Sequence, residues 1–155
     1  MQGFSCIFEC ISKYKKPLVG HNCLSDMMRI YQNFLDDLPE SYDAFKRLVH
    51  QAFPCVYDTK HIAYFARRQL LEDSDEFPFD SETLRQTSLG ELFEKIQKAK
   101  PGSFSYTPRI SHSKMTPKYD AGKNEDFAHE AGFDAFMSGF VFVRLSHVMA
   151  GLDFL

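Results

Sequence analysis

The chain has 155 residues, a hydrophobic fraction of 44% with sixteen Phe and no Trp, and a formal net charge of −3. This length corresponds to one domain or a large piece of one, and the apolar content excludes an intrinsically disordered chain. The slightly acidic balance gives the molecule as a whole no attraction for nucleic acid.

Four cysteines, Cys6, Cys10, Cys23 and Cys55, occur without any C-x-x-C pair, which argues against a zinc site. No signal peptide is recognised, and no apolar run approaches 18 residues. We therefore expect reduced thiols in a soluble intracellular protein without a membrane segment.

Helical spacing of apolar residues predicts an amphipathic helix over residues 3–15, which Pro17 ends. Residues 17–21 (PLVGH) fit a short buried strand. Asn22 is a suitable N-cap for the next helix, over residues 23–35. Its apolar side comprises Leu24, Met27, Met28, Tyr31, Phe34 and Leu35.

The same pattern of a helix followed by a strand recurs in the next segment. A helix is predicted over residues 41–53, a second short strand within FPCVYD (53–58), and a further helix over residues 59–71. Short apolar strands that alternate with helices favour the α/β class. In that class, ligands bind beyond the carboxyl ends of the strands, which is where His21, Asn22 and Asp58 fall.

The second half of the chain begins with an acidic block and continues with a basic one. Residues 72–94 carry eight acids against Arg85, and residues 95–123 carry seven Lys and Arg against Asp120. Such blocks indicate either solvated loops or a loop that faces phosphate groups.

Two helices and a long polar loop are predicted in this half. Ser88 and Glu91 form a capping box at the start of a helix that ends near residue 100. Residues 101–126 are predicted to be a polar loop. The segment from residue 129 onward, HEAGFDAFMSGFVFVRLSHVMAG, predicts a helix whose aromatic residues belong to the core.

Three polar residues stand out against this background, each with an ordinary alternative. Asp26 shares a helical stripe with Asn22, Arg29 and Asn33, so it is either a ligand or part of a solvated face. Asp134 lies in an apolar helix, where a carboxylate needs a partner. His129 can approach Asp134 only if it precedes the regular helix. Lys60, just after the second strand, is either solvated or meets an anion.

Five motifs in this chain occur together in a known family. They are GHNCLSD (20–26), LPESYDAFK (38–46), FPCVYDTK (53–60), TSLGEL (87–92) and HEAGFDAF (129–136). In order and approximate spacing, they resemble the poly(A)-specific ribonuclease family of DEDDh 3′-to-5′ exonucleases, from about residue 2 to residue 150. The family includes PARN-like trimmers of piRNA 3′ ends and a Cajal-body deadenylase.

The resemblance implies a ribonuclease-H-like fold and a role for each candidate residue. Asp26 and Asp134 correspond to metal ligands, His129 to the general base, and Lys60 to a residue that contacts the RNA. Two Mg²⁺ ions roughly 3.5–4 Å apart would clamp the scissile phosphate and need carboxylate oxygens. An imidazole with an ordinary pKa near 6.5 can deprotonate the attacking water near neutral pH.

The chain departs from the family pattern at the first motif, an Asp-x-Glu on an N-terminal strand. The only Asp-x-Glu here, Asp80-Ser81-Glu82, lies in the acidic block and is interpreted as coincidental. We therefore expect residues 1–155 to be the C-terminal portion of the exonuclease domain, lacking its first strands and two of the usual four metal ligands. The isolated chain should then bind metal poorly and be marginally stable, whereas a sharply melting monomer would contradict this expectation.

Three functional hypotheses follow. The first is a Mg²⁺-dependent exoribonuclease that acts on single-stranded 3′ ends of poly(A) or short RNA tails in the nucleus or cytoplasm, with this portion alone inactive. The second is a non-catalytic RNA-binding or partner-binding module from a truncated isoform. The third is an incomplete sequence with no function of its own. The residues leave open which RNA is the substrate, which subfamily applies and whether the protein forms a homodimer.

Overall fold

The computed structural model describes residues 3–72, 83–85, 88–98, 108, 110–111, 127 and 130–152. The chain forms two compact units, residues 1–58 and residues 59–155, and each is considered by itself. Of the sequence predictions, His129, the Asp80-x-Glu82 stretch and most of the polar loop 101–126 lie outside the described residues.

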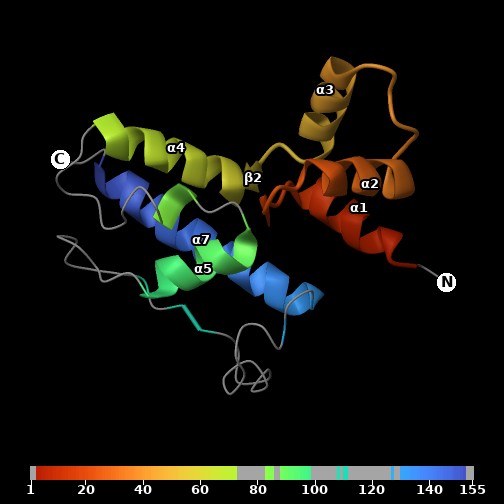
Figure 1. Cartoon of the computed structure of the whole chain (residues 1–155). Coiled ribbons are helices and arrows are strands. Elements are labelled where there is room, and N and C mark those ends of the chain that lie inside the picture. Colours follow the sequence, from red (N-terminus) through yellow and green to blue (C-terminus); the bar gives the residue numbers. More distant parts are fainter. Residues whose placement is uncertain are drawn as a thin grey trace. The chain divides into compact units, whose positions relative to one another are not determined.

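The first unit alternates helices and strands in the predicted order (Figure 1). Its elements are α1 (Ser5–Tyr14), β1 (Leu18–Gly20), α2 (Leu24–Phe34), α3 (Tyr42–Ala52) and β2 (Val56–Asp58). The three helices and both strands fall within the predicted ranges. The helices form where apolar residues recur every three to four positions, a pattern that is visible in the local sequence.

The two strands pair in parallel, with Leu18 opposite Val56 and Gly20 opposite Asp58. Helices α2 and α3 form the connection between them, as a parallel pair requires. The described part of the chain is therefore a mixture of helices and strands with a small parallel sheet, in agreement with the predicted α/β class. The pairing brings the carboxyl ends of β1 and β2 together.

The core of the first unit lies between its helices and the sheet. Met27, Tyr31, Phe45 and Phe53 are buried. Of the apolar side predicted for α2, Met27 and Tyr31 are buried and Phe34 is half-buried, whereas Leu24, Met28 and Leu35 are exposed. The ring of Phe34 stacks on that of Phe8 from α1, with ring centroids 4.4 Å apart. Aromatic packing therefore joins the first helix to the second.

The second unit is helical in its described part. It contains α4 (Thr59–Glu72), the short 3-10 helix η1 (Thr83–Arg85), α5 (Leu89–Lys98) and α7 (Ala131–Leu152). Helix α7 packs along both α4 and α5 (Figure 1). The capping pair predicted for α5 is present, since the Ser88 hydroxyl donates to a carboxylate oxygen of Glu91 at 2.8 Å and the helix begins at the next residue.

Helix α7 supplies, from one of its faces, half of the buried residues in the described core of the second unit. The prediction that its aromatic residues are core is confirmed for Phe133 and Phe140, which are almost fully buried. The buried apolar residues of α7 recur at helical spacing and are Phe133, Met137, Phe140, Val141, Leu145 and Val148. These side chains pack with residues of α4 and α5.

Helix α7 lies almost entirely within the segment predicted for it from residue 129 onward and is strongly apolar. Residues Ala131–Ala150 have a mean hydropathy of 1.2, so by length and composition alone this helix could cross a membrane. Asp134 and Arg144 interrupt the segment, so it qualifies by its average hydropathy and not by an unbroken apolar run. The apolar content also has a structural reason in the folded unit, because one face of α7 forms the core described above.

Candidate functional site

The carboxyl ends of the two parallel strands form a small polar centre around Asp58. One carboxylate oxygen of Asp58 accepts a hydrogen bond from the backbone N–H of Asn22, and the other accepts one from the N–H of Cys23, both at 2.9 Å. These N–H groups belong to the turn that leads into α2. The Asp58 carboxylate at the end of β2 therefore accepts hydrogen bonds at the start of α2, where the helix dipole is positive.

The predicted N-cap role of Asn22 is wrong. The N-cap residue of α2 is Cys23, which makes no side-chain capping bond. Asn22 lies one residue earlier, with a left-handed backbone φ of 55°, a conformation that Asn tolerates better than most residues. The Asp58 carboxylate takes over the capping role from a position 36 residues later in the chain.

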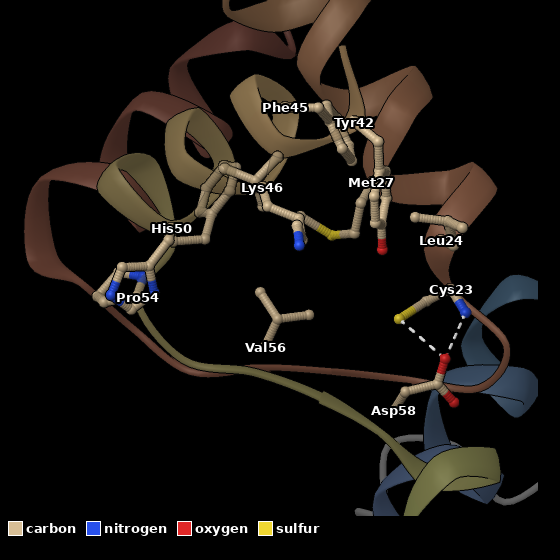
Figure 2. A pocket seen from close by; sticks show the side chains of 12 residues that line it. Cys23, Leu24, Met27, Tyr42, Phe45, Lys46, His50, Pro54, Val56 and Asp58 are labelled. Atoms are coloured by element: carbon tan, nitrogen blue, oxygen red, sulfur yellow. Dashed lines mark hydrogen bonds between the residues drawn. The ribbon is translucent and has the colours of Figure 1, made fainter.

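The same centre controls the chemistry of Cys23. Its thiol lies 3.7 Å from a carboxylate oxygen of Asp58, as Figure 2 shows. Burial raises the pKa of Cys23 to about 11, with further contributions from the charge of Asp58, its hydrogen bond and the charge of Asp26. The thiol therefore stays protonated near neutral pH. Since the thiolate is the reactive form, Cys23 is unsuited to act as a nucleophile.

Asp26 lies in the first turn of α2, close to this centre, and is exposed. The polar stripe predicted around it is present, because Asn22, Arg29 and Asn33 are exposed as well. Asn33 is engaged locally, donating its side-chain amide to the carbonyl oxygen of Arg29 at 2.8 Å. Within the described part of the chain, no hydrogen bond or ion pair occupies the Asp26 carboxylate.

Asp134 lies in the first turn of α7 in the second unit and is half-buried. Its backbone N–H donates to the carbonyl oxygen of Glu130 at 2.9 Å. The neighbouring Phe133 is buried, with its ring centroid 6.2 Å from that of Phe93 on α5. Aromatic packing therefore holds the turn that carries Asp134 against the core.

The described part of this segment begins at Glu130, and α7 begins at Ala131. The site role of His129 stays a prediction, because the residue lies outside the described part of the chain.

Lys60 lies in the first turn of α4 in the second unit and is half-buried. It follows Thr59, which is fully buried and anchors the start of the helix. The predicted position just after the second strand is confirmed, while the predicted contact with RNA stays a prediction.

The predicted site residues are divided between the two units. Asp26 belongs to the first unit, and Lys60 and Asp134 belong to the second. No group of three or more His, Cys, Asp or Glu side chains that could hold a metal ion occurs among the residues that the structure describes. What the structure does bring together is Asp58, Cys23 and the start of the helix that carries Asp26.

Comparison with known proteins adds a family match over most of the chain. A family model described as CAF1 family ribonuclease matches residues 1–142. The human protein named poly(A)-specific ribonuclease PNLDC1 is 33% identical over 148 residues, which cover 96% of this chain and 26% of the relative.

Two further relatives cover this chain to a similar extent. The pre-piRNA 3′-exonuclease trimmer of Bombyx mori is 32% identical over 145 residues, covering 94% of this chain and 25% of the relative. The poly(A)-specific ribonuclease PARN of Xenopus laevis is 31% identical over 149 residues, covering 95% of this chain and 20% of the relative. The chain thus spans between 20% and 26% of the length of these three relatives.

Proposed function

Because this chain belongs to the CAF1 family of ribonucleases, we propose that it forms the C-terminal portion of a 3′-to-5′ exoribonuclease domain with a ribonuclease-H-like fold. The domain removes nucleotides one at a time from poly(A) or from short RNA tails. Relatives at 31% to 34% identity carry names of poly(A)-specific ribonucleases and of a piRNA trimmer. The parallel sheet, with helices in the connection between its strands, is compatible with such a nuclease fold.

The observation that carries the proposal is the position of Asp26. Its carboxylate is exposed in the first turn of α2, next to the carboxyl ends of two parallel strands, which is where α/β proteins bind their ligands. No protein group occupies it within the described residues. Asp58 fixes the turn before this helix through two backbone hydrogen bonds, so Asp58 acts as a positioning residue.

The carboxylates of Asp26 and Asp134 are ligands of the kind that magnesium prefers. Mg²⁺ prefers oxygen ligands and commonly binds through one or two carboxylates together with water and phosphate oxygens. Asp26 and Asp134 supply carboxylates that are exposed and half-buried, respectively, and so are not consumed by packing. When bound, two such ions polarise the scissile phosphate and stabilise the attacking and leaving oxygens.

The protein groups do the rest of the chemistry. His129 accepts a proton from the attacking water through a ring nitrogen. Lys60 places an ammonium group against an RNA phosphate, supplying charge and a hydrogen-bond donor. Asp26 and Asp134 each offer a carboxylate for a metal ion, from the first turn of α2 and of α7 respectively.

The test restores a family-derived N-terminal half and follows shortening of a 3′-labelled oligo(A) in Mg²⁺. Asp26→Asn and Asp134→Asn should each reduce the rate by about a hundredfold or more, because each removes a charged metal ligand. His129→Ala should reduce it by about 10²- to 10⁴-fold. Glu9→Gln, which removes an exposed acid from α1, is the matched control and should leave the rate unchanged.

Undiminished shortening by the Asp26 and Asp134 variants would refute the assigned roles. Tight binding of the labelled RNA without any shortening, despite a folded domain, would instead favour a non-catalytic RNA-binding module.

A further inference from the structure

The first unit contains a pocket between α2, α3 and β2, with a volume of about 320 Å³. Its walls are mostly apolar. The lining residues are Cys23, Leu24, Met27, Tyr42, Phe45, Lys46, Val49, His50, Phe53, Pro54, Val56 and Asp58. All of them belong to the first unit, and none is among the residues assigned to metal binding or proton transfer above.

A cation and an aromatic ring converge on this pocket from α3. The Lys46 ammonium lies 5.0 Å from the centroid of the Tyr42 ring. Figure 2 shows both side chains extending from α3 into the space beside Met27, with Val56 and Cys23 across from them. The Tyr42 ring also packs near that of Phe45, with centroids 6.4 Å apart, but Tyr42 is 60% exposed, so the exposed part of the ring can stack on a planar group.

We propose that this pocket binds a single nucleotide, the class of product that the proposed exonuclease releases. The inference rests on the proposed function for the identity of the ligand and on the pocket for its chemistry. A volume near the lower end of small-molecule sites, about 300–1,000 Å³, suits one nucleotide. The base stacks on Tyr42 against the apolar wall, and the phosphate pairs with Lys46.

A neighbouring acid competes with the phosphate for Lys46. A carboxylate oxygen of Asp43 lies 2.8 Å from the Lys46 ammonium, and both side chains are largely exposed. Exposed ion pairs are weak, so a phosphate dianion can replace the carboxylate. The ion pair therefore predicts opposite effects of two substitutions on nucleotide affinity. Removal of Asp43 should strengthen nucleotide binding, and removal of Lys46 should weaken it.

The experiment is calorimetric titration of the 155-residue chain with 5′-AMP in EDTA, which excludes metal-dependent binding at the proposed cleavage site. We expect saturable binding at one site, with adenosine and inorganic phosphate each at least about tenfold weaker because each satisfies only half of the pocket. Lys46→Gln and Tyr42→Ala should each weaken AMP binding about tenfold. Asp43→Asn should strengthen it several-fold.

The chain contains a matched control for both variants. On α1, the Lys13 ammonium lies 5.6 Å from the Tyr14 ring centroid, and Tyr14 is 59% exposed. This second Lys–Tyr pair has the same chemistry without a place in the pocket lining. Lys13→Gln and Tyr14→Ala should therefore leave AMP binding unchanged.

Several outcomes would overturn the proposal. These are an absence of AMP binding, equal losses in the α1 and α3 variants, and amide chemical-shift changes on AMP addition that avoid α3 and β2. The shift map uses the unaltered chain, so it decides even where a variant fails to fold. Loss of binding in Asp26→Asn would place the nucleotide at the cleavage site instead.

The two proposals fail separately. Shortening of oligo(A) by the restored domain without AMP binding would refute only the nucleotide-pocket proposal. AMP binding without shortening would refute only the exonuclease proposal.

Discussion

Replacing Asp58 tests how the first unit organises its polar centre. Asp58→Ala removes the acceptor of two backbone hydrogen bonds at the start of α2, both at 2.9 Å. A hydrogen bond to a charged group contributes about 1.5–3 kcal/mol, and loss of a helix cap typically costs about 1 kcal/mol. Asn22 is exposed, so water compensates part of the loss. We expect a decrease of about 2 kcal/mol in the free energy of unfolding.

Asp58→Asn separates the two hydrogen bonds. The amide keeps one acceptor oxygen but replaces the other with a donor group, so one backbone N–H loses its partner. We expect a decrease of about 1 kcal/mol, half of that for alanine. Both values come from the urea midpoint of the far-UV circular dichroism signal. Asp43→Asn, which removes an exposed ion pair on α3, is the control and should lower the midpoint far less.

A second measurement follows Cys23 in the same variants. Two of the causes that raise the pKa of Cys23 to about 11 are the charge of Asp58 and its hydrogen bond with the thiol. In Asp58→Ala, the pKa should therefore fall towards the ordinary value of 9.0. The pH dependence of alkylation reports it once Cys6, Cys10 and Cys55 are replaced by Ser. An unchanged urea midpoint together with an unchanged thiol pKa would refute the reasoning.

Three further predictions concern stability. The raised pKa of Cys23 means that its thiol ionises more readily in the unfolded chain. The free energy of unfolding should therefore fall by roughly 1 kcal/mol, a value discounted for partial exposure, as the pH rises from about 9 to about 11. Cys23→Ala should abolish this loss in urea titrations. Phe93→Ala should cost about 3–5 kcal/mol because Phe93 is 1% exposed, whereas Val143→Ala, at a 38% exposed position, should cost far less. Gly20→Ala should lower the melting temperature, since its Cβ would lie 2.7 Å from that of Cys23, whereas Gly90→Ala meets nothing within 4 Å and should raise it.

The helices of this chain were predictable because their signals are local. Apolar spacing of three to four residues placed α1 to α5, and the Ser88–Glu91 pair marked the start of α5. Helix α7 was predicted over nearly the residues that it occupies, because its apolar positions recur at helical spacing although Asp134 and Arg144 interrupt them.

In the candidate site, too, the features with a local sequence signal were predictable and the long-range contacts were not. Asp26 and Asp134 were proposed from short motifs, and they lie in the first turns of α2 and α7; their roles stay predictions. The role of Asp58 was not proposed beyond its position at a strand end. Its partners Asn22 and Cys23 lie 36 and 35 residues earlier, and a local pattern cannot identify a contact over that separation.

By itself, the sequence determined the helices, the two short strands, the ribonuclease family and the acids that the proposed chemistry needs. Only the tertiary structure decided that β1 and β2 pair in parallel, that Asp58 rather than Asn22 serves the start of α2, and that α2, α3 and β2 enclose a pocket. The physical reason is that helix periodicity acts between neighbours in the chain. Strand register, capping by a distant carboxylate and the shape of a cavity arise only when remote segments come into contact.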